Sequence, residues 1–465
     1  MTSSSLPRGP NGYPLLGHAS SLLRDALEFL RQCAGKYGDP VPLRFFGKPV
    51  LFVNHPDTIA HVLATSHRKI VKGIARRSDH ILLGDGISLS EGDAWLRERR
   101  LMQPAFYRER VATYGEDMVT LTERMLEAWR DGETRDIYVE MSNLTLAIVG
   151  KTLLGIDVWD DAPDLATAIV SALACRDAHA RSVSMLLPPS LPTPTNLRMR
   201  LARRKIDDIV QRVIDARRTA NDDHDDLLAL LLRAQDENGG TMTDQQVRNE
   251  ILTIFVGGHE TVADLLSWTW YLLSQHPEVE ARLLAEFDTS LGGRLPTVSD
   301  LPRLPYAAMV VSEVLRLYPP ASVLMREAVA DFEIGARRVT RGTEIVVSPW
   351  VIHRDPRYFA DPEEFNPDRW ADGLASRLPR YAYLPFGGGP RLCIGRSFAM
   401  MEAVLVLAAV AQRFHLELQP GHRVVAETIP TLHPNFGLRM VLHRRQPGGA
   451  ECSATGGRSP ARTDR

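Results

Sequence analysis

The chain of 465 residues carries 55 Lys and Arg against 57 Asp and Glu, a formal net charge of −2, and 44% of its residues are hydrophobic. This balance argues against a nucleic-acid-binding protein, whose affinity needs an excess of cations, and it is typical of a soluble globular chain. The four cysteines form no C-x-x-C pair, which excludes a zinc ribbon, a dithiol redox motif and a c-type haem attachment site.

The two ends differ in composition from the rest. Residues 1–12 are small and turn-prone, so we expect a flexible N-terminal segment, and residues 446–465 are polar and Gly-rich, so we expect a disordered tail. Residues 13–445 are expected to form a single domain. We find no signal peptide and no run of about 18 apolar residues, so we predict no membrane span and a cytoplasmic location.

Helical periodicity dominates between the ends. A helix over 22–37 is followed by a strand pair at 41–46 and 50–53, and strand-like alternation returns at 338–347 and 437–442. We therefore predict a mainly α protein with small β-sheets. Further helices are predicted at 57–66, 93–103, 115–130, 137–153, 197–218, 225–236, 243–275, 277–291, 305–317 and 396–414.

Two segments stand out. Residues 245–274 contain no Pro and predict a central helix of roughly 45 Å, in which the pair Gly257-Gly258 indicates that another group approaches the backbone closely. Residues 188–194 (PPSLPTP) form a breaker-rich loop, which is equally consistent with a surface connection and with a flexible access lid.

The run from Phe386 to Gly395 places Cys393 in a Gly-rich turn directly before a predicted helix. Backbone N–H groups in such a turn stabilise a thiolate. The run resembles the cysteine-ligand loop of the cytochrome P450 family, F-x-x-G-x-R-x-C-x-G, with every fixed position filled. The resemblance extends from about residue 10 to residue 443. It implies the P450 fold, with the long central helix over a haem b group that is sandwiched against the Cys-loop helix. It also implies that Cys393 is the axial metal ligand.

Two further motifs agree with this resemblance. Glu313 and Arg316 form an E-x-x-R pair on one helix face, and the resemblance implies that Arg369 completes a buried network that holds the Cys loop. The segment Gly257-Gly258-His259-Glu260-Thr261 resembles the family's [AG]-G-x-[DE]-T motif. It implies space above the iron at Gly257, a hydrogen bond from Thr261 to bound oxygen and proton relay through Glu260.

Several residues match the family's haem-contact positions. The resemblance implies that the haem propionates are held by cationic and aromatic side chains, because Arg pairs well with carboxylates. The cofactor-binding set is Cys393, Arg391, Arg326, Trp95, Arg99, Phe386 and Gly257.

The implied activity is insertion of one oxygen atom of O₂ into a C–H bond of a hydrophobic small molecule, such as a terpenoid, fatty acid or polyketide. The chain has no flavin module or iron–sulfur cysteine cluster, so electrons would come from NAD(P)H through a separate ferredoxin and ferredoxin reductase. A basic cluster could face that donor or simply be solvated: Arg97, Arg99, Arg100, Arg108 and Arg110. The apolar segments that fall at the family's pocket positions are 74–89, 175–191, 251–262, 321–324 and 431–432.

Two other functions stay open. A peroxide-dependent enzyme or isomerase would use the same thiolate-ligated haem without external electrons. A non-catalytic haem-binding sensor would need no Thr261.

Overall fold

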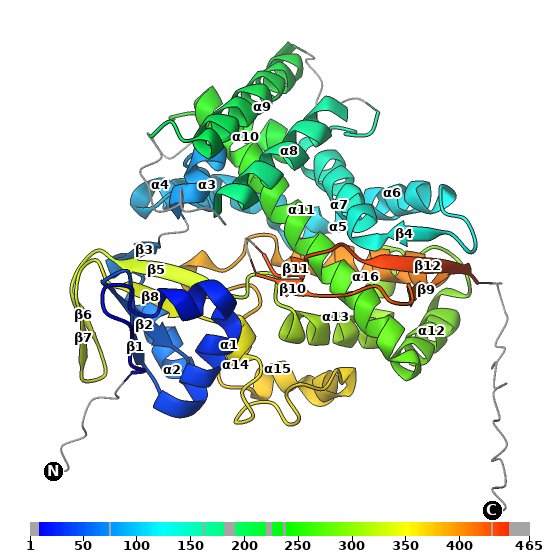
Figure 1. The fold of residues 1–465 in the computed structure, drawn as a ribbon. Coiled ribbons are helices and arrows are strands. Elements are labelled where there is room, and N and C mark those ends of the chain that lie inside the picture. Colours follow the sequence, from blue (N-terminus) through cyan, green and yellow to red (C-terminus); the bar gives the residue numbers. More distant parts are fainter. Residues whose placement is uncertain are drawn as a thin grey trace, which may run out of the picture.

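The computed structural model describes residues 9–73, 76–160, 163–180, 191–219, 226–235, 239–428 and 431–445. Helices dominate, and α11 (Asp244–Gln275) runs through the middle of the molecule (Figure 1). The predicted fold class, mainly α with small sheets, is confirmed.

Some helices follow one another directly, whereas strands and loops separate others, as between residues 317 and 349. In chain order they are α1 (Ala19–Tyr37), α2 (Pro56–Ala60), α3 (Arg76–Leu83), α4 (Gly92–Met102), α5 (Arg108–Thr113), α6 (Gly115–Glu127), α7 (Ile137–Leu154), α8 (Pro163–Ala180), α9 (Pro194–Thr219), α10 (Leu227–Arg233), α11, α12 (Pro277–Leu291), α13 (Pro305–Leu317), α14 (Pro349–Ile352), α15 (Leu374–Arg377) and α16 (Arg396–Ala411).

A five-stranded sheet has the order β1-β2-β8-β5-β3 and joins the N-terminal region to residues 324–347. Its strands are β1 (Val41–Phe45), β2 (Lys48–Val53), β3 (Ile70–Lys72), β5 (Leu324–Ala328) and β8 (Glu344–Val347). The predicted hairpin is β1 and β2, and β2 then pairs in parallel with β8.

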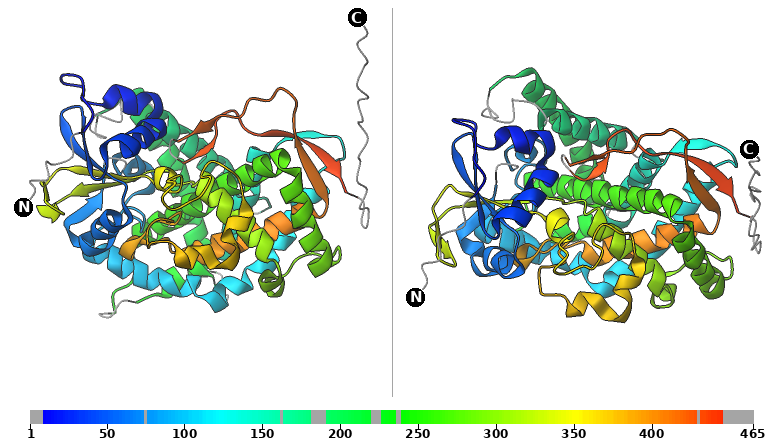
Figure 2. Two further views of the ribbon diagram at one scale, coloured as in Figure 1. Left: turned by 90° about the horizontal axis from the view of Figure 1, so that it is seen from below. Right: turned by 60° about the horizontal axis from the view of Figure 1, so that its bottom comes forward.

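The remaining sheets are small. A three-stranded sheet, β4 (Thr134–Asp136), β12 (Arg439–Arg444) and β9 (Phe414–Leu418), lies on the side of the molecule opposite the blue N-terminal elements (Figure 2). The two-stranded sheets are β6 (Phe332–Ile334) with β7 (Arg337–Val339), and β10 (Ala426–Glu427) with β11 (His433–Pro434).

Sequence signals explain the bounds of α11. Thr243 caps its N-terminus in a capping box with Gln246, and the helix ends at Gln275, just before His276 and Pro277. Most side chains along α11 are buried, because α7, α9, α13 and α16 pack around it. A helix enclosed on all sides is a rigid frame for the residues at its centre.

One segment, Gly389–Ala411, is long and apolar enough to cross a membrane by length and composition, among the residues that the structure describes. It contains α16, and 61% of its most apolar window is buried inside the protein, as in a core helix. Its buried residues pack in the main hydrophobic cluster with α6, α11 and α13.

Candidate active site

The middle of α11 contains an interruption in an otherwise buried helix. Gly257 is exposed and Thr261 half-buried, whereas the flanking residues Phe255 and Val262 are buried. A Cβ added at Gly257 would meet nothing within 4 Å, so free space borders the helix here. The Thr261 hydroxyl donates to the Gly257 carbonyl at 2.7 Å, a bond that local helix geometry favours.

The neighbouring glycine has a packing role. A Cβ at Gly258 would lie 2.7 Å from Cγ2 of Val149 on α7, so only glycine permits the observed approach of the two helices. His259 makes a hydrogen bond of 2.7 Å through Nε2 to the Ser142 hydroxyl of α7. Burial lowers the pKa of His259 to about 4, so this imidazole is neutral at pH 7.

Glycines also shape the loop that carries Cys393. Gly389 has φ +66°, and a Cβ there would lie 2.0 Å from the Leu63 carbonyl oxygen, so the loop depends on glycine at this position. The Cys393 N–H donates to the Phe386 carbonyl at 3.0 Å and closes the turn. α16 begins three residues later, at Arg396.

The Cys393 thiol is exposed although protein surrounds it. Burial raises its pKa, while the Gly395 N–H and the charges of Arg99, Arg396 and Lys72 lower it. An exposed but desolvated thiol opens onto an enclosed space rather than onto bulk water.

A buried ionic network holds the segment that precedes this loop. Glu313 and Arg316 of α13 are fully buried and paired at 2.8 Å, and Arg369 Nε also reaches Glu313 at 2.8 Å. The Trp370 indole N–H donates to the same carboxylate at 2.9 Å. The predicted Glu313–Arg316–Arg369 network is confirmed, and the carboxylate is fully compensated, as a buried charge requires.

His353 links this network to the Cys loop. Burial and the Arg316 charge lower the pKa of His353 to about 3, so the ring is neutral. Its Nδ1 donates to the Arg316 carbonyl at 3.2 Å, and its Nε2 accepts the Leu384 N–H at 2.9 Å. Sequence analysis missed this residue, because no local pattern shows that it bridges two distant segments.

Arg391 is enclosed beside the loop. Its guanidinium lies 4.4 Å from the Trp95 ring centroid, donates to the Ser90 carbonyl at 2.6 Å and forms an ion pair with Glu91. Arg99 instead donates to the Leu392 carbonyl at 3.1 Å. The structure therefore brings Trp95, Arg99 and Arg391 to the same loop.

A second cationic residue, Lys72, lies beside Arg326, and sequence analysis did not identify it. The β3–β5 register pairs Lys72 with Arg326, and both lie in the wall of a small pocket with Glu91 and Arg391. Burial and the neighbouring cations lower the pKa of Lys72 to about 7, and burial with Arg391 lowers that of Arg326 to about 10. Among the described residues that line this pocket, Glu91 is the only acidic one, so cations are in excess there.

Glu260 is held by an ion pair with Arg176 of α8. The distance is 2.6 Å, and the Arg176 side chain is 4% exposed. Arg176 also contacts Asp177 at 2.9 Å. Asp264, one turn beyond Glu260, is fully buried and its pKa is well above the ordinary value, chiefly because of desolvation. Neither Arg176 nor Asp264 was identified from the sequence.

The predicted pocket segments are only partly observable. Residues 74–75 and 181–190 lie outside the described residues, and with them residues 188–190 of the possible lid at 188–194. Residues 251–262 belong to α11, and the Trp268 indole N–H donates to the Leu432 carbonyl at 2.8 Å, which fixes segment 431–432 against the same helix.

In the basic cluster, Arg97 donates to the Gly240 and Thr241 carbonyls, while Arg100 and Arg108 are exposed.

Comparisons with known proteins agree with this geometry. The family model for cytochrome P450 matches residues 7–439. Cyclooctatin synthase of Streptomyces melanosporofaciens is 38% identical over 89% of this chain and 91% of its own. Pentalenene oxygenase of Streptomyces avermitilis is 34% identical over 94% and 97%. The structure of the retinoic acid-bound cyanobacterial CYP120A1 has a TM-score of 0.84 and 27% identity, and the match covers 96% of this chain and 100% of that one.

The chain belongs to the cytochrome P450 family and is a P450 monooxygenase. The family uses iron protoporphyrin IX with an axial cysteine thiolate.

The residues present fit this group. The exposed thiol of Cys393 lies just before α16, and free space borders Gly257 in α11, which packs against α16. In the wall of the nearby pocket, cationic side chains outnumber acidic ones. An anionic, flat cofactor would satisfy all three features.

Proposed function

We propose that the protein hydroxylates a hydrophobic terpenoid at a haem held by Cys393. The observation that carries the proposal is the placement of an exposed thiol before α16 and of exposed Gly257 and half-buried Thr261 in α11, two helices that pack together. Thiolate-ligated haem supplies activation of O₂ when bound. We also propose that residues 13–445 form one domain around this site.

In this proposal the side chains around the cofactor have separate tasks. Arg391, Arg326 and Lys72 hold the two propionates, and the excess positive charge of their pocket supports this role. Three residues keep the Cys393 loop in place. Arg99 donates a hydrogen bond to the Leu392 carbonyl, and the Trp95 ring packs against the Arg391 guanidinium. The Phe386 carbonyl accepts the Cys393 N–H.

Proton supply falls to Thr261 and Glu260. Thr261 can donate its hydroxyl proton toward the free space beside Gly257, and Glu260 can replace that proton from the buried polar side chains behind it. In the structure the Glu260 carboxylate is paired with Arg176. Glu260 therefore has to loosen this ion pair before it transfers a proton.

The substrate class is inferred from relatives and from the apolar residues at the family's pocket positions. Cyclooctat-9-en-7-ol 5-monooxygenase of Streptomyces melanosporofaciens, named for an alcohol, is 37% identical over 89% of this chain, and pentalenene oxygenase is named for an alkene. The α11 segment at the family's pocket positions is rich in apolar residues, among them Ile254, Val256 and Val262, which suits an apolar molecule. A terpenoid therefore fits better than a charged metabolite.

Electrons are proposed to come from NAD(P)H through a separate ferredoxin and its reductase in the cytoplasm. Exposed Arg100 and Arg108 could receive an acidic donor near the Cys393 side of the molecule.

The decisive experiment is the reduced-CO difference spectrum of the purified protein. A thiolate ligand gives a Soret band near about 450 nm, and Cys393→Ala is expected to abolish it, while Cys175→Ala leaves it unchanged. A band at about 420 nm in the wild type, or an unchanged band in Cys393→Ala, would overturn the assignment.

Product formation with different electron donors distinguishes the alternatives. A monooxygenase forms product only with NAD(P)H and ferredoxin, whereas a peroxide-dependent enzyme forms it with peroxide alone. An absence of product with every donor would favour a haem sensor.

A further inference from the structure

The first half of α9 and the residues just before it carry an unusual charge pattern. Residues 191–205 contain five cations and no Asp or Glu, in a chain whose net charge is −2. The cations are Arg198, Arg200, Arg203, Arg204 and Lys205. Acidic residues begin at Asp207, so the positive segment is confined to one end of the helix.

Apolar side chains face outward in the same segment. Met199 and Ile206 are buried where α9 packs against α8, α3 and α11. Leu197 and Leu201 lie four residues apart on the other face and are 45% and 64% exposed. Leu191, just before the helix, is 42% exposed.

Exposed cations flank this apolar stripe. Arg198, Arg204 and Lys205 are all exposed and, by helical spacing, lie on either side of Leu197 and Leu201. Further along the same face the exposed residues are polar, with Asp208 and Asp215 at the matching positions. We define the α9 patch as Leu191, Leu197, Leu201, Arg198, Arg204 and Lys205.

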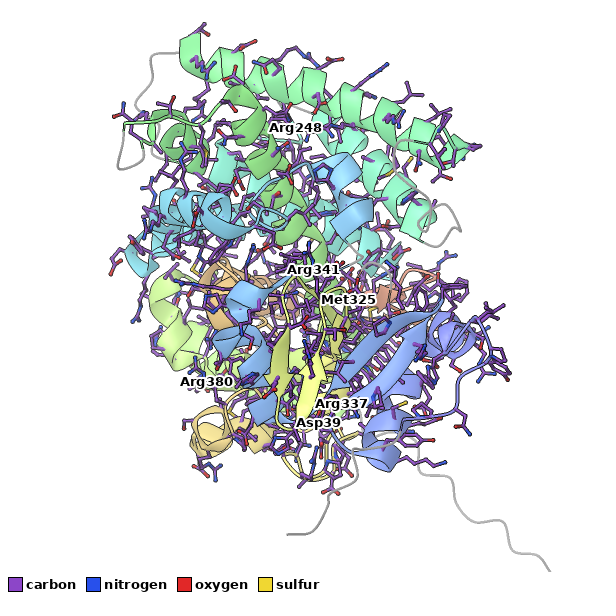
Figure 3. All side chains as sticks on the ribbon, turned by 90° about the vertical axis from the view of Figure 1, so that its left-hand side faces the viewer. Asp39, Arg248, Met325, Arg337, Arg341 and Arg380 are labelled. Atoms are coloured by element: carbon purple, nitrogen blue, oxygen red, sulfur yellow. The ribbon has the colours of Figure 1, made fainter. Side chains whose placement is uncertain are left out.

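We propose that the α9 patch docks on an anionic lipid bilayer surface. A helix whose outward face has leucines in the middle and cations at the edges can place its apolar side chains at the headgroup boundary while the cations contact lipid phosphates. The helix α9 lies across the outside of the molecule, above Arg248 in this view (Figure 3). A deformable bilayer can contact an outer helix without the shaped groove that a folded partner would need.

The position of the patch suits delivery of an apolar substrate, a consequence that rests on the proposed function. α9 lies at the outer edge of the molecule beyond α11, whereas α16, which follows the Cys393 loop, lies on the other side of that helix (Figure 1). Docking through α9 would leave the Cys393 side free. The bilayer contact itself requires no haem chemistry, so the two proposals can fail separately.

Vesicle flotation of the haem-loaded full chain tests the docking. We expect the protein to float with vesicles of phosphatidylglycerol and phosphatidylcholine, not with phosphatidylcholine alone, and to be released by 0.5 M NaCl, because salt screens surface charges. Each cation near an anionic surface contributes about fivefold to binding. The variant Arg198→Gln/Arg204→Gln/Lys205→Gln should therefore bind about 100-fold more weakly, and Leu197→Ser/Leu201→Ser at least about tenfold more weakly.

Matched controls separate the patch from general effects. Arg377→Gln/Arg380→Gln/Arg439→Gln removes the same charge from exposed positions elsewhere, and Val139→Ser removes a 48% exposed apolar side chain from α7. Both should bind like the wild type. Circular dichroism and the reduced-CO spectrum verify that each variant is folded and loaded.

Three results would overturn the docking proposal. They are no flotation of the wild type with anionic vesicles, equal losses in the control variants, or binding of an acidic ferredoxin through the patch without vesicle binding. An absent thiolate spectrum together with normal flotation would instead overturn the proposed function alone.

Discussion

At the scale of single residues, the ion pair between Arg176 and Glu260 has a large predicted effect on stability. Both side chains are almost fully buried, at 4% and 10% exposed. Removal of Arg176 leaves Glu260 without its cation beside Asp177 and Asp264. Arg176→Gln should therefore lower the free energy of unfolding by about 3 kcal/mol, as measured by urea denaturation.

A double-mutant cycle identifies the cause. Arg176→Gln/Glu260→Gln should recover part of the loss, because the uncompensated carboxylate is gone. Arg413→Gln removes the exposed pair with Glu123, 2.8 Å apart, and should change stability by less than about 1 kcal/mol. Equal losses of unfolding free energy in Arg176→Gln and Arg413→Gln would contradict the role of burial.

Thr261 allows a prediction about proton supply. Its hydroxyl donates to the Gly257 carbonyl of the same helix. Thr261→Ala removes a proton donor without changing the fold, so product formed per electron consumed should fall at least about tenfold, with hydrogen peroxide released instead. Thr261→Ser should restore most of the coupling. Unchanged coupling in the alanine variant would exclude the proposed role.

At the scale of elements, the two glycines in α11 give a matched pair of substitutions. Gly258→Ala places a Cβ 2.7 Å from Val149 on α7 and should destabilise the protein by about 1–3 kcal/mol through overpacking. Gly257→Ala meets no atom within 4 Å and should stabilise the helix by about 0.5–1 kcal/mol.

The free energies of unfolding of Gly258→Ala and Gly257→Ala are compared by thermal or urea unfolding. Val149→Ala combined with Gly258→Ala should relieve the clash and recover part of the loss. If both glycine variants have the same stability, the close contact of α7 with α11 is not the reason for Gly258.

Helix α13 and the segment after α14 depend on one carboxylate. Glu313 accepts hydrogen bonds from Arg316, Arg369, Trp370 and the Asn366 N–H. Glu313→Gln leaves two buried guanidinium groups without a counter-charge, so unfolding free energy should fall by about 3–5 kcal/mol. Asp331→Asn, which removes the exposed pair with Arg338, is the control and should have little effect.

At the scale of the whole molecule, a buried carboxyl pair between α4 and α11 makes stability depend on pH. Glu98 and Glu250 are 4% and 1% exposed, and Glu250 accepts the Ile87 N–H at 3.0 Å. Burial raises the pKa of Glu250 to about 8 from its ordinary 4.5. Between these values the folded state keeps a proton that the unfolded chain releases, so this group makes stability fall as pH rises, by up to about 1.4 kcal/mol per pH unit.

The measurement is the free energy of unfolding of wild type and Glu250→Gln between pH 5 and pH 8. The variant should lose this part of the slope, because glutamine does not titrate yet can still accept from Ile87. Other titrating groups, Lys72 included, are common to both proteins and cancel in the difference, except Glu98, whose carboxyl interacts with Glu250 and titrates together with it. Parallel curves would contradict the raised pKa.

Local signals predicted much of this architecture. Capping residues, Pro and Gly mark the limits of α11, α12 and α13, and the Cys393 loop is contiguous in sequence. α8 was missed because its apolar residues give no clear face. β4 was missed as well, since no strand was predicted between residues 53 and 338. Lys72, Arg176 and His353 were missed because their roles arise from register and tertiary contacts.

The parallel pairing of β2 with β8 joins residues 50–53 to residues 344–347. A ribosome must therefore release nearly three quarters of the polypeptide before its earliest sheet can close, and the thiol loop emerges later still. Such long-range contacts form slowly, and the incomplete chain exposes strand edges meanwhile. Nascent chains stopped before β8 should consequently bind holdase chaperones, whereas chains extended beyond α16 should be released from them when haem is supplied.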